Sequence, residues 1–517
     1  MDGAIGLLGY RGYHAGAGER ARHYMHAGNN FLQKQGVAPD RRSRFVNDKR
    51  KGMSKVGIGI DFGTSNSAAA VFDGEQLQLL RLEQNDDIIP SATYIDRSLT
   101  AQTGQQAVSQ YIADNTGRTV ELIPEVVGET SQFVEGGGGD EVAEVDTATQ
   151  KIYGAPITDS GMQGRLFRGT KRLLGDETVR RLMVFDQPFR LVALITPLLL
   201  RIRHSIEQQV GAVNAAHLGY PVNFEGRDRF ANDLALNRLG EAFNYAGIKT
   251  QHFFPEPIAA AVSYLHSNPY AEGELLLTLD FGGGTLDFCV LRRQGQDFEV
   301  VATHGIGLGG DHLDQLLFRK LLFPHLGKGQ VWRRRGFDRE IETQFPFEDF
   351  EELLINWAIT YTLNQNRYTT PVMECIAAGG PAQKQFERLR DVIKHNLSYL
   401  LFSRIKDFKA QLSTVDQAVL DIPEIDLAIP MQRAEFETLI SEPIAAVAQA
   451  LDTVVAKAGL QHDDIGIVLR TGGSSLIPAV NDLLTQRFSA RVVDHDPFTS
   501  VAAGLAIANF RQLQYTP

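Results

Sequence analysis

At 517 residues, the chain is too long for a single compact hydrophobic core, so two or more domains are expected. Hydrophobic residues make up 43% of the sequence, which is enough material for those cores. The formal net charge of −11 at pH 7 argues against a broad nucleic-acid-binding surface and suits a soluble protein.

The two cysteines, Cys289 and Cys375, are far apart in the sequence, and neither belongs to a pair or cluster with metal-binding spacing. This usage predicts two structural thiols in a reducing compartment, so a cytoplasmic location is expected. The best apolar run, residues 191–200, is interrupted by Pro197 and is too short to cross a bilayer. No membrane partner is therefore expected.

The chain begins with a basic leader, residues 1–54, which lacks the apolar stretch of a secretion signal. Met53 stands immediately before the first predicted strand, so the leader is interpreted as a disordered tail or as an extension upstream of the true start. A tether to nucleic acid or to a membrane is the less favoured alternative. The folded part is expected to begin near Lys55.

The first predicted strand leads directly into a glycine turn. Residues 58–67, Ile-Gly-Ile-Asp-Phe-Gly-Thr-Ser-Asn-Ser, have the pattern of a strand, a tight turn and a second strand. A glycine turn lets backbone N–H groups approach phosphate oxygens, and the hydroxyls of Thr64 and Ser65 add donors. The carboxylate of Asp61 can hold a hydrated metal ion.

A strongly acidic stretch follows this opening meander. Nine acidic side chains, a single arginine and four consecutive glycines occur within residues 114–150. This composition predicts a flexible acidic insertion over residues 114–160, most simply a solvated loop without a core. Regular structure is expected to resume with a helix at 189–210, a strand at 218–224, a helix at 226–247 and a strand-helix unit at 253–264.

A second acidic glycine turn repeats the first pattern. Residues 279–287, Leu-Asp-Phe-Gly-Gly-Gly-Thr-Leu-Asp, lie between predicted strands. Two halves that open with the same meander indicate a duplication with a cleft between them. This organisation resembles that of the actin-like ATPases, and the resemblance implies an α/β, actin-like two-lobed ATPase fold with a duplicated mixed β-sheet, helices and nucleotide in the interlobe cleft. The predicted division is lobe I at 55–269, lobe II at 270–497 and a C-terminal helix, 498–517, that returns to lobe I.

With both turns in place, the chain resembles the heat shock protein 70 (DnaK-type) family within the actin-like ATPase superfamily. The resemblance extends from Val56 to Phe510. An isolated Asp-x-Gly-Thr would be weak evidence, but a series of motifs in the same order is specific. Besides the turns, the motifs are residues 168–175, 253–264, 305–314, 406–413, 471–478 and 494–504. The resemblance implies ATP or ADP as the ligand, with Mg²⁺.

The resemblance implies that the two glycine turns hold the phosphates. The implied phosphate-binding residues are Gly63, Thr64, Ser65 and Asn66 in the first turn and Gly282, Gly283, Gly284 and Thr285 in the second. It also implies that Asp61 and Asp280 hold Mg²⁺ through water, in keeping with the water shell that magnesium usually retains in proteins.

Lys171 falls on the family's catalytic lysine, which positions the attacking water and offsets charge that develops on the γ-phosphate. Considered alone, it would be interpreted as a solvated helix residue, but its place between the two turns favours the catalytic role. Glu256 matches a carboxylate near the metal-bound waters, and Asp280 and Asp287 complete the implied catalytic set. For these two aspartates the alternative is capping of the turn by their side chains.

The adenosine end of the implied site departs from the family pattern. Matching residues are Lys409 and Ser413 on one predicted helix and Gly472, Gly473 and Ser474 on a loop. Lys406 replaces a glutamate that contacts ribose, and Ala410 and Leu476 replace arginines that stack on adenine. The loss of both cationic stacks costs roughly 1 kcal/mol or more in adenine affinity. We therefore expect weaker or less base-selective nucleotide binding.

Only 13 residues follow Gly504, too few for the peptide-binding domain of the family. The expected function is that of a chaperone-like protein that hydrolyses ATP slowly and acts through a protein partner of unknown identity. Two alternatives stay open. One is a non-catalytic nucleotide-dependent scaffold or cytoskeletal relative, and the other is a small-molecule kinase of the same superfamily.

Overall fold

The computed structural model of the chain describes residues 55–134, 146–185, 187–222, 229–268, 273–294, 297–335, 338–489 and 491–515. Residues Lys55–Pro517 form one compact unit. The basic leader, residues 1–54, lies outside the described residues.

A mixed β-sheet is built around the first glycine turn. Its strands are β1 (Gly57–Phe62), β2 (Asn66–Phe72), β3 (Leu77–Leu79), β4 (Ile88–Pro90), β12 (Ala215–Tyr220) and β13 (Thr250–Pro255). The order is β13-β12-β1-β2-β3, and β4 also pairs with β2. β1 and β2 are antiparallel, whereas β12 runs parallel to β1 and β13 parallel to β12. The turn thus lies at the carboxyl end of a central strand.

Two helices share a hydrophobic core with this sheet. In α3 (Leu191–Val210) and α4 (Arg229–Tyr245), the buried apolar side chains recur at helical spacing and join the core that contains Ile58 and Ile60. The predicted helix 189–210 begins two residues later than expected, because Gln187–Arg190 pairs as a strand. Of the predicted helix 226–247, the first three residues lie outside the described part of the chain.

A second sheet repeats the first one. Its strands are β14 (Leu275–Phe281), β15 (Leu286–Gln294), β16 (Asp297–Ile306), β21 (Ile467–Thr471) and β22 (Arg491–Asp494), in the order β16-β15-β14-β21-β22. Again an antiparallel meander is followed by two parallel strands. The second glycine turn joins β14 to β15, just as the first joins β1 to β2. The predicted duplicated, actin-like fold is therefore confirmed.

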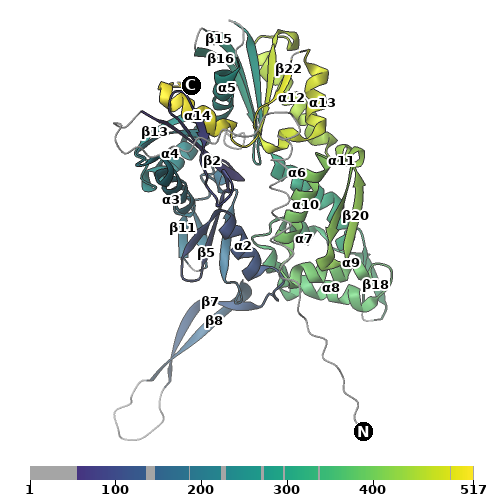
Figure 1. The fold of residues 1–517 in the computed structure, drawn as a ribbon. Coiled ribbons are helices and arrows are strands. Elements are labelled where there is room, and N and C mark those ends of the chain that lie inside the picture. Colours follow the sequence, from purple (N-terminus) through teal and green to yellow (C-terminus); the bar gives the residue numbers. More distant parts are fainter. Residues whose placement is uncertain are drawn as a thin grey trace, which may run out of the picture. The chain divides into compact units, whose positions relative to one another are not determined.

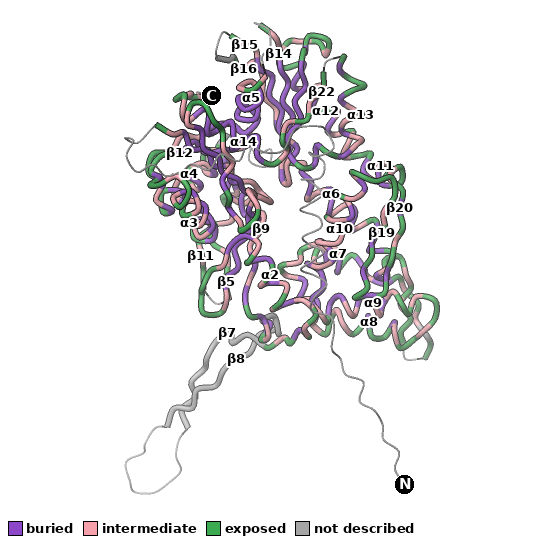
Figure 2. The backbone as a smooth tube through the Cα atoms, in the orientation of Figure 1, coloured by how far each residue is buried: buried purple, intermediate pink, exposed green. Residues whose placement is uncertain are grey.

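Two helices cross between the sheets. α5 (Glu256–Ser267) follows β13 of the first sheet but packs on β14 and β15, and α14 (Ser500–Arg511) follows β22 but packs on β1 and β2. In Figure 1 the yellow α14 accordingly lies beside the purple strands of the N-terminal half. Figure 2 shows α5 buried together with the central strands. These helices share one core with residues of both sheets.

The contact between the two helices depends on glycine. A Cβ atom at Gly504 would lie 1.7 Å from the backbone oxygen of Ala259, so α14 and α5 touch backbone to backbone. Under α14, a Cβ at Gly59 would lie 2.3 Å from the backbone oxygen of Ala502. Because only glycine fits at these positions, the sequence fixes where the two halves of the fold meet.

The acidic insertion is not the loop that its composition predicts. The backbone of β7 (Leu122–Val134) pairs antiparallel with β8 (Asp146–Asp159) in a long hairpin. β-Branched residues occur in both segments, chiefly valine in β7 and threonine and isoleucine in β8, and their β-propensity outweighs the acidic composition. The glycine-rich residues 135–145 lie outside the described part of the chain. The hairpin adjoins a small sheet of β5 (Ala92–Asp96), β6 (Ala101–Thr103) and β9 (Gly164–Arg168), on which α2 (Gly104–Asn115) packs.

The rest of lobe II is mainly helical and surrounds a phenylalanine-rich core. Fully buried rings include Phe318, Phe323, Phe345, Phe350 and Phe386. The elements that build it are α6 (Gly310–Leu317), β17 (Val331–Arg335), β18 (Glu340–Gln344), α7 (Glu348–Ile355), α8 (Asn366–Ala378), α9 (Gln383–Lys394), α10 (Ser398–Leu412), β19 (Gln417–Ile422), β20 (Leu427–Gln432), α11 (Arg433–Leu439), α12 (Ser441–Lys457) and α13 (Pro478–Arg487).

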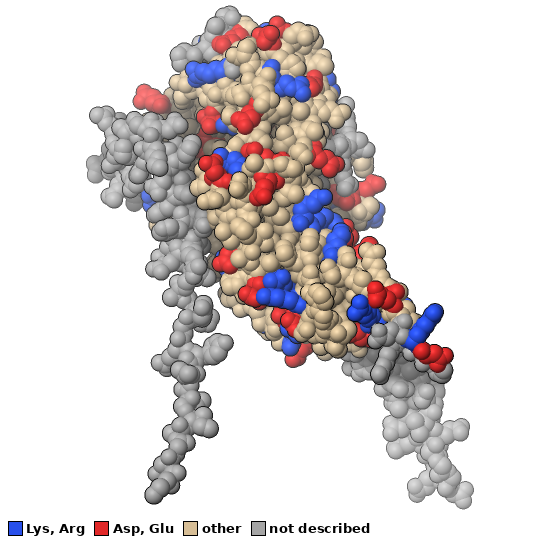
Figure 3. Space-filling view, turned by 90° about the vertical axis from the view of Figure 1, so that its right-hand side faces the viewer, with Lys and Arg blue, Asp and Glu red and all other residues tan. Residues whose placement is uncertain are grey.

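Within the described ranges, no single helix has the length and apolarity to cross a bilayer. The pair α11 and α12 meets these criteria only when its two helices are taken together, and it is bent by 64°. On the face shown in Figure 3, acidic and basic side chains are interspersed in small groups, without an extended field of one sign.

Candidate functional site

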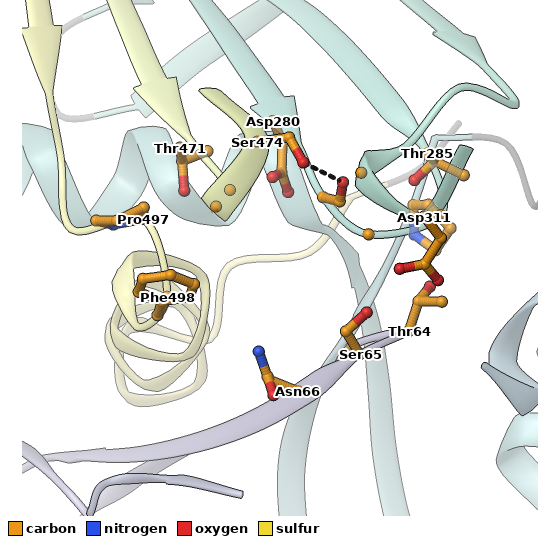
Figure 4. Close-up of a pocket in the computed structure, with 18 of the residues that line it drawn as sticks. Thr64, Ser65, Asn66, Asp280, Thr285, Asp311, Thr471, Ser474, Pro497 and Phe498 are labelled. Carbon is orange, nitrogen blue, oxygen red and sulfur yellow. Dashed lines mark hydrogen bonds between the residues drawn. The ribbon is translucent and has the colours of Figure 1, made fainter. Parts of the chain in front are cut away.

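The two glycine turns meet directly. A Cβ atom at Gly283 would lie 2.3 Å from Ser65 Oγ, and one at Gly284 would lie 2.9 Å from Thr64 Oγ1. Figure 4 shows Thr64 and Ser65 on one side and Thr285 on the other, with their hydroxyls near the same space. Because no side chain fits between the turns, their backbones and hydroxyls face one another across a narrow gap.

A cavity of roughly 250 Å³ opens beside these turns and has walls from both lobes. All but one of the predicted site residues line it. They are Asp61, Gly63, Thr64, Ser65, Asn66, Lys171, Glu256, Asp280, Gly282, Gly283, Gly284, Thr285, Lys409, Ser413, Gly472, Gly473 and Ser474. Residues that are widely separated in sequence therefore converge on one concave surface.

Asp287 is the exception. Its side chain is buried, it does not line the cavity, and its Oδ1 accepts a hydrogen bond from the backbone N–H of Val222 at 3.1 Å. In the β14–β15 ladder it stands directly opposite Asp280. The structure thus places Asp287 behind the cavity wall, where it connects the second glycine turn to the loop after β12.

A buried cluster of charges forms the inner end of the cavity. Lys171, in the short 3₁₀ helix η1 (Thr170–Leu173), donates a hydrogen bond to Glu256 Oε1 at 2.5 Å, and both residues are buried. Glu256 is the first residue of α5, so the crossing helix delivers this carboxylate to the cavity. Asp61 and Asp280, each one residue before the end of its strand, complete the cluster.

The charges in this cluster perturb one another. Burial, together with the charge of Glu256, raises the pKa of Asp61 well above its ordinary value, although Lys171 opposes the shift. Burial and the charges of Glu256 and Asp287 raise the pKa of Asp280 to about 8. Burial alone lowers the pKa of Lys171, but the charges of Glu256 and Asp61 outweigh it, and the net pKa is raised. One lysine therefore faces an excess of carboxylates.

The other end of the cavity lies between α10 and the loop after β21. Lys409 donates to the backbone oxygen of Gly310 at 2.8 Å and pairs with Asp314 at 2.6 Å, so its ammonium group is already held. Ser474 donates to the backbone oxygen of Gly282 at 3.2 Å, which ties this loop to the second glycine turn. This hydrogen bond thus connects the outer end of the cavity to the glycine turn at its inner end.

Three residues that depart from the family pattern occupy different places. Lys406 and Ala410 line the cavity, whereas Leu476 lies outside its wall and is 38% exposed. Position 410 therefore faces the cavity without a cationic side chain, and position 476 contributes nothing to its surface.

Several other lining residues were not among the predicted site residues. Arg172 approaches Asp311 at 3.3 Å, and this ion pair connects η1 of lobe I with α6 of lobe II. Pro497 and Phe498, in the loop between β22 and α14, form part of the outer rim. Arg172 belongs to the motif at 168–175, and Pro497 and Phe498 belong to the motif at 494–504. Membership of a motif does not show what a side chain faces.

The lobes also meet away from the cavity, at an aromatic contact formed by Tyr111, Trp357 and Tyr399. Their rings pack edge to face, with centroids 5.0–5.7 Å apart, and Tyr111 comes from α2 of lobe I. Beside them, the backbone N–H groups of Gly117 and Val120 donate to His395 and Lys394 oxygens, each at 2.9 Å. This contact joins the lobes at a second point.

Trp357→Ala is expected to loosen this aromatic contact. Edge-to-face pairs contribute about 1 kcal/mol beyond area burial, so the amides of Gly117 and Val120 should exchange with solvent roughly fivefold faster. Hydrogen exchange followed by mass spectrometry measures this rate. Trp332→Ala, at the other tryptophan and outside the contact, is the control. Unchanged exchange in Trp357→Ala would show that the backbone bonds hold the lobes without the rings.

Comparisons with known proteins agree with this geometry. The family model described as Hsp70 protein matches residues 171–328 and 382–509. Heat shock 70 kDa protein BIP3 of Oryza sativa subsp. japonica is 25% identical over 454 residues, which cover 87% of this chain and 56% of that protein. Chaperone protein DnaK 3 of Synechococcus sp. is 25% identical over 464 residues, or 88% of this chain and 57% of the relative. The chain thus spans little more than half the length of these relatives.

Proposed function

The chain belongs to the Hsp70 protein family, and on that premise we propose that it binds Mg-ATP in the cavity between the lobes and hydrolyses it slowly. The observation that carries the proposal is the convergence of both glycine turns, Lys171 and the carboxylate cluster on a single cavity. We further propose that lobe closure around the nucleotide is transmitted to a protein partner, as expected of a chaperone-like protein.

The facing turns suit a row of phosphates. Glycine backbones expose N–H groups, and the hydroxyls of Thr64, Ser65 and Thr285 supply further donors from both sides. A ligand held by both turns would bridge the lobes, because one turn belongs to each sheet. This supports a nucleotide-dependent change in how tightly the lobes close.

The carboxylate cluster fits a hydrated divalent cation. Asp61 Oδ1 is buried and has no hydrogen-bond partner. The three carboxyl groups of Asp61, Glu256 and Asp280 outnumber the single ammonium group of Lys171. The described residues contain no cluster that could hold a metal ion directly, which favours contact through water. Bound Mg²⁺ would favour the ionised forms of Asp61 and Asp280, whose pKa values burial raises, and it would neutralise charge on the phosphates.

Lys171 is the proposed catalytic residue. Its Nζ is buried beside Glu256, so its position is set before substrate arrives. A fixed cation at this point would stabilise charge that develops on the γ-phosphate, and Asp280 would orient the attacking water. Such preorganised electrostatic contacts are worth the most in a site from which water is largely excluded.

The partners and location remain part of the proposal. We propose an unidentified protein partner, with neither nucleic acid nor a membrane as a ligand. Cys289 and Cys375 are both buried and unpaired, which supports a reducing compartment such as the cytoplasm.

The test is release of phosphate from Mg-ATP by the purified chain, compared with Asp280→Asn. We expect the variant to lose about 100-fold in turnover, because it no longer positions water and hydrated metal. Asp463→Asn, at an exposed aspartate outside the cavity, should behave as the parent. ADP formation that requires an added sugar would indicate a kinase, and nucleotide binding without turnover would indicate a scaffold. Absence of nucleotide binding would overturn the proposal.

A further inference from the structure

Phe498 is a large apolar side chain on the rim of the proposed nucleotide cavity. It is 42% exposed, although most phenylalanines in the described part of the chain are buried in the cores. Pro497 lies beside it, and the apolar residues Ile477 and Ala410 also line the cavity. An exposed aromatic ring in a cavity that already holds charged groups at its inner end provides a place for the uncharged part of a ligand.

Hydrogen bonds hold the backbone that carries this ring. Asp496 Oδ1 accepts hydrogen bonds from the N–H groups of Phe498 and Thr499, at 3.2 and 3.1 Å. The oxygen of Pro497 accepts a bond from the N–H of Gly472 at 3.0 Å. The residue therefore sits on a clamped turn that is bonded to the loop after β21, and little freedom has to be lost when a ligand binds.

The ring also contacts that loop. A Cβ atom at Gly473 would lie 3.0 Å from Phe498 Cε1 and 3.3 Å from its Cζ, so the ring edge rests on bare backbone. Figure 4 shows Phe498 and Pro497 on the side of the cavity opposite Thr64 and Thr285. The cavity therefore has a polar end at the two glycine turns and an aromatic end at Phe498.

We propose that Phe498 is the stacking platform for the nucleobase, an inference that rests on the proposed function. An aromatic ring stacks on any base, because every base has a π-face, and it reads no hydrogen-bonding edge. Phe498 thus replaces affinity that the chain lacks at Ala410 and Leu476 without restoring selectivity. The nucleotide binding expected at this end discriminates little between bases and is not restricted to adenine.

Calorimetric titration of ADP, GDP and tripolyphosphate, each with Mg²⁺, tests the proposal. In Phe498→Ala the affinities for ADP and GDP should both fall roughly tenfold or more, while that for tripolyphosphate should stay unchanged. Phe498→Trp should retain binding, and its added fluorescence should be quenched by ADP but not by tripolyphosphate. Phe230→Ala is the matched control, because Phe230 is 66% exposed on α4 and does not line the cavity.

The outcomes separate this inference from the proposed function. If the parent binds neither ADP nor tripolyphosphate, both the proposed function and the stacking role of Phe498 are overturned. If the parent binds ADP and Phe498→Ala binds it equally well, only the platform is overturned. A lower thermal stability of Phe498→Ala with unchanged ADP affinity would also overturn it, since the ring would then serve only to hold the glycine loop.

Discussion

Lys171→Ala is expected to lower single-turnover phosphate release from Mg-ATP by at least about 100-fold while leaving nucleotide affinity within a few-fold of the parent. The reason is that the lysine is buried beside Glu256 and faces the carboxylates at the ends of β1 and β14. A cation there matters most when charge develops on the transferred phosphoryl group. Phosphate release under single-turnover conditions, with ADP binding measured separately, tests this split.

Loss of stability is the main confounding effect, and a double variant removes it. Lys171→Ala alone leaves Glu256 buried without its partner, which costs about 3–5 kcal/mol in pairs of this kind. The double variant Lys171→Ala with Glu256→Gln removes both charges and should recover much of the unfolding free energy, but not turnover. Lys384→Ala changes an exposed surface lysine and serves as the control. Parent-like turnover in the double variant would remove Lys171 from the mechanism.

The parts of the fold that were predictable from the sequence are those in which local backbone geometry restricts residue choice. A strand that ends in an acidic residue and is followed by glycines and hydroxyl residues predicts such a turn. Only glycine permits the two turns to approach as closely as Gly283 approaches Ser65. Since the pattern occurs twice with the same flanking strands, the duplicated sheets also follow. Both sheets have the expected order of a meander and parallel strands.

The sequence was less informative where tertiary contacts decide. Asp287 belongs to the same turn motif as Asp280, yet its carboxylate bonds to the backbone of Val222 behind the cavity. Composition alone suggested a loop at 114–160, although two segments in it that contain β-branched residues pair as β7 and β8. In both cases the deciding partner lies far away in sequence or on a second strand.

Phe498 and Arg172 illustrate a second limit. Both residues lie within motifs of the sequence, but no local pattern distinguishes Phe498 from an ordinary loop phenylalanine or Arg172 from a solvated arginine. Phe498 reaches the cavity because Asp496 accepts hydrogen bonds from its turn and the N–H of Gly472 donates to Pro497. Arg172 contributes to the site because it forms an ion pair with Asp311 of the other lobe. Such roles depend on tertiary contacts between segments that are distant in sequence, and residue type alone does not reveal them.

Gly504→Ala is expected to lower the free energy of unfolding by about 3 kcal/mol or more, at the upper end of the cost of overpacking. The added methyl group would lie 1.7 Å from the backbone oxygen of Ala259, and a backbone atom, unlike a side-chain tip, cannot rotate away. The helices α5 and α14 must therefore separate. Urea unfolding monitored by circular dichroism measures the change.

The matched control is Gly240→Ala in the middle of α4, where the nearest atom to the new methyl group is the side-chain Oε1 of Gln251 at 3.1 Å, which can move. Alanine is the better helix former by about 1 kcal/mol, so this variant should be neutral or slightly more stable. Because α5 carries Glu256 to the cavity, separation of the helices in Gly504→Ala should also displace this carboxylate and slow turnover. Equal stability of the parent and Gly504→Ala would mean that α5 and α14 can slide apart freely, and the crossing helices could then not couple the two sheets.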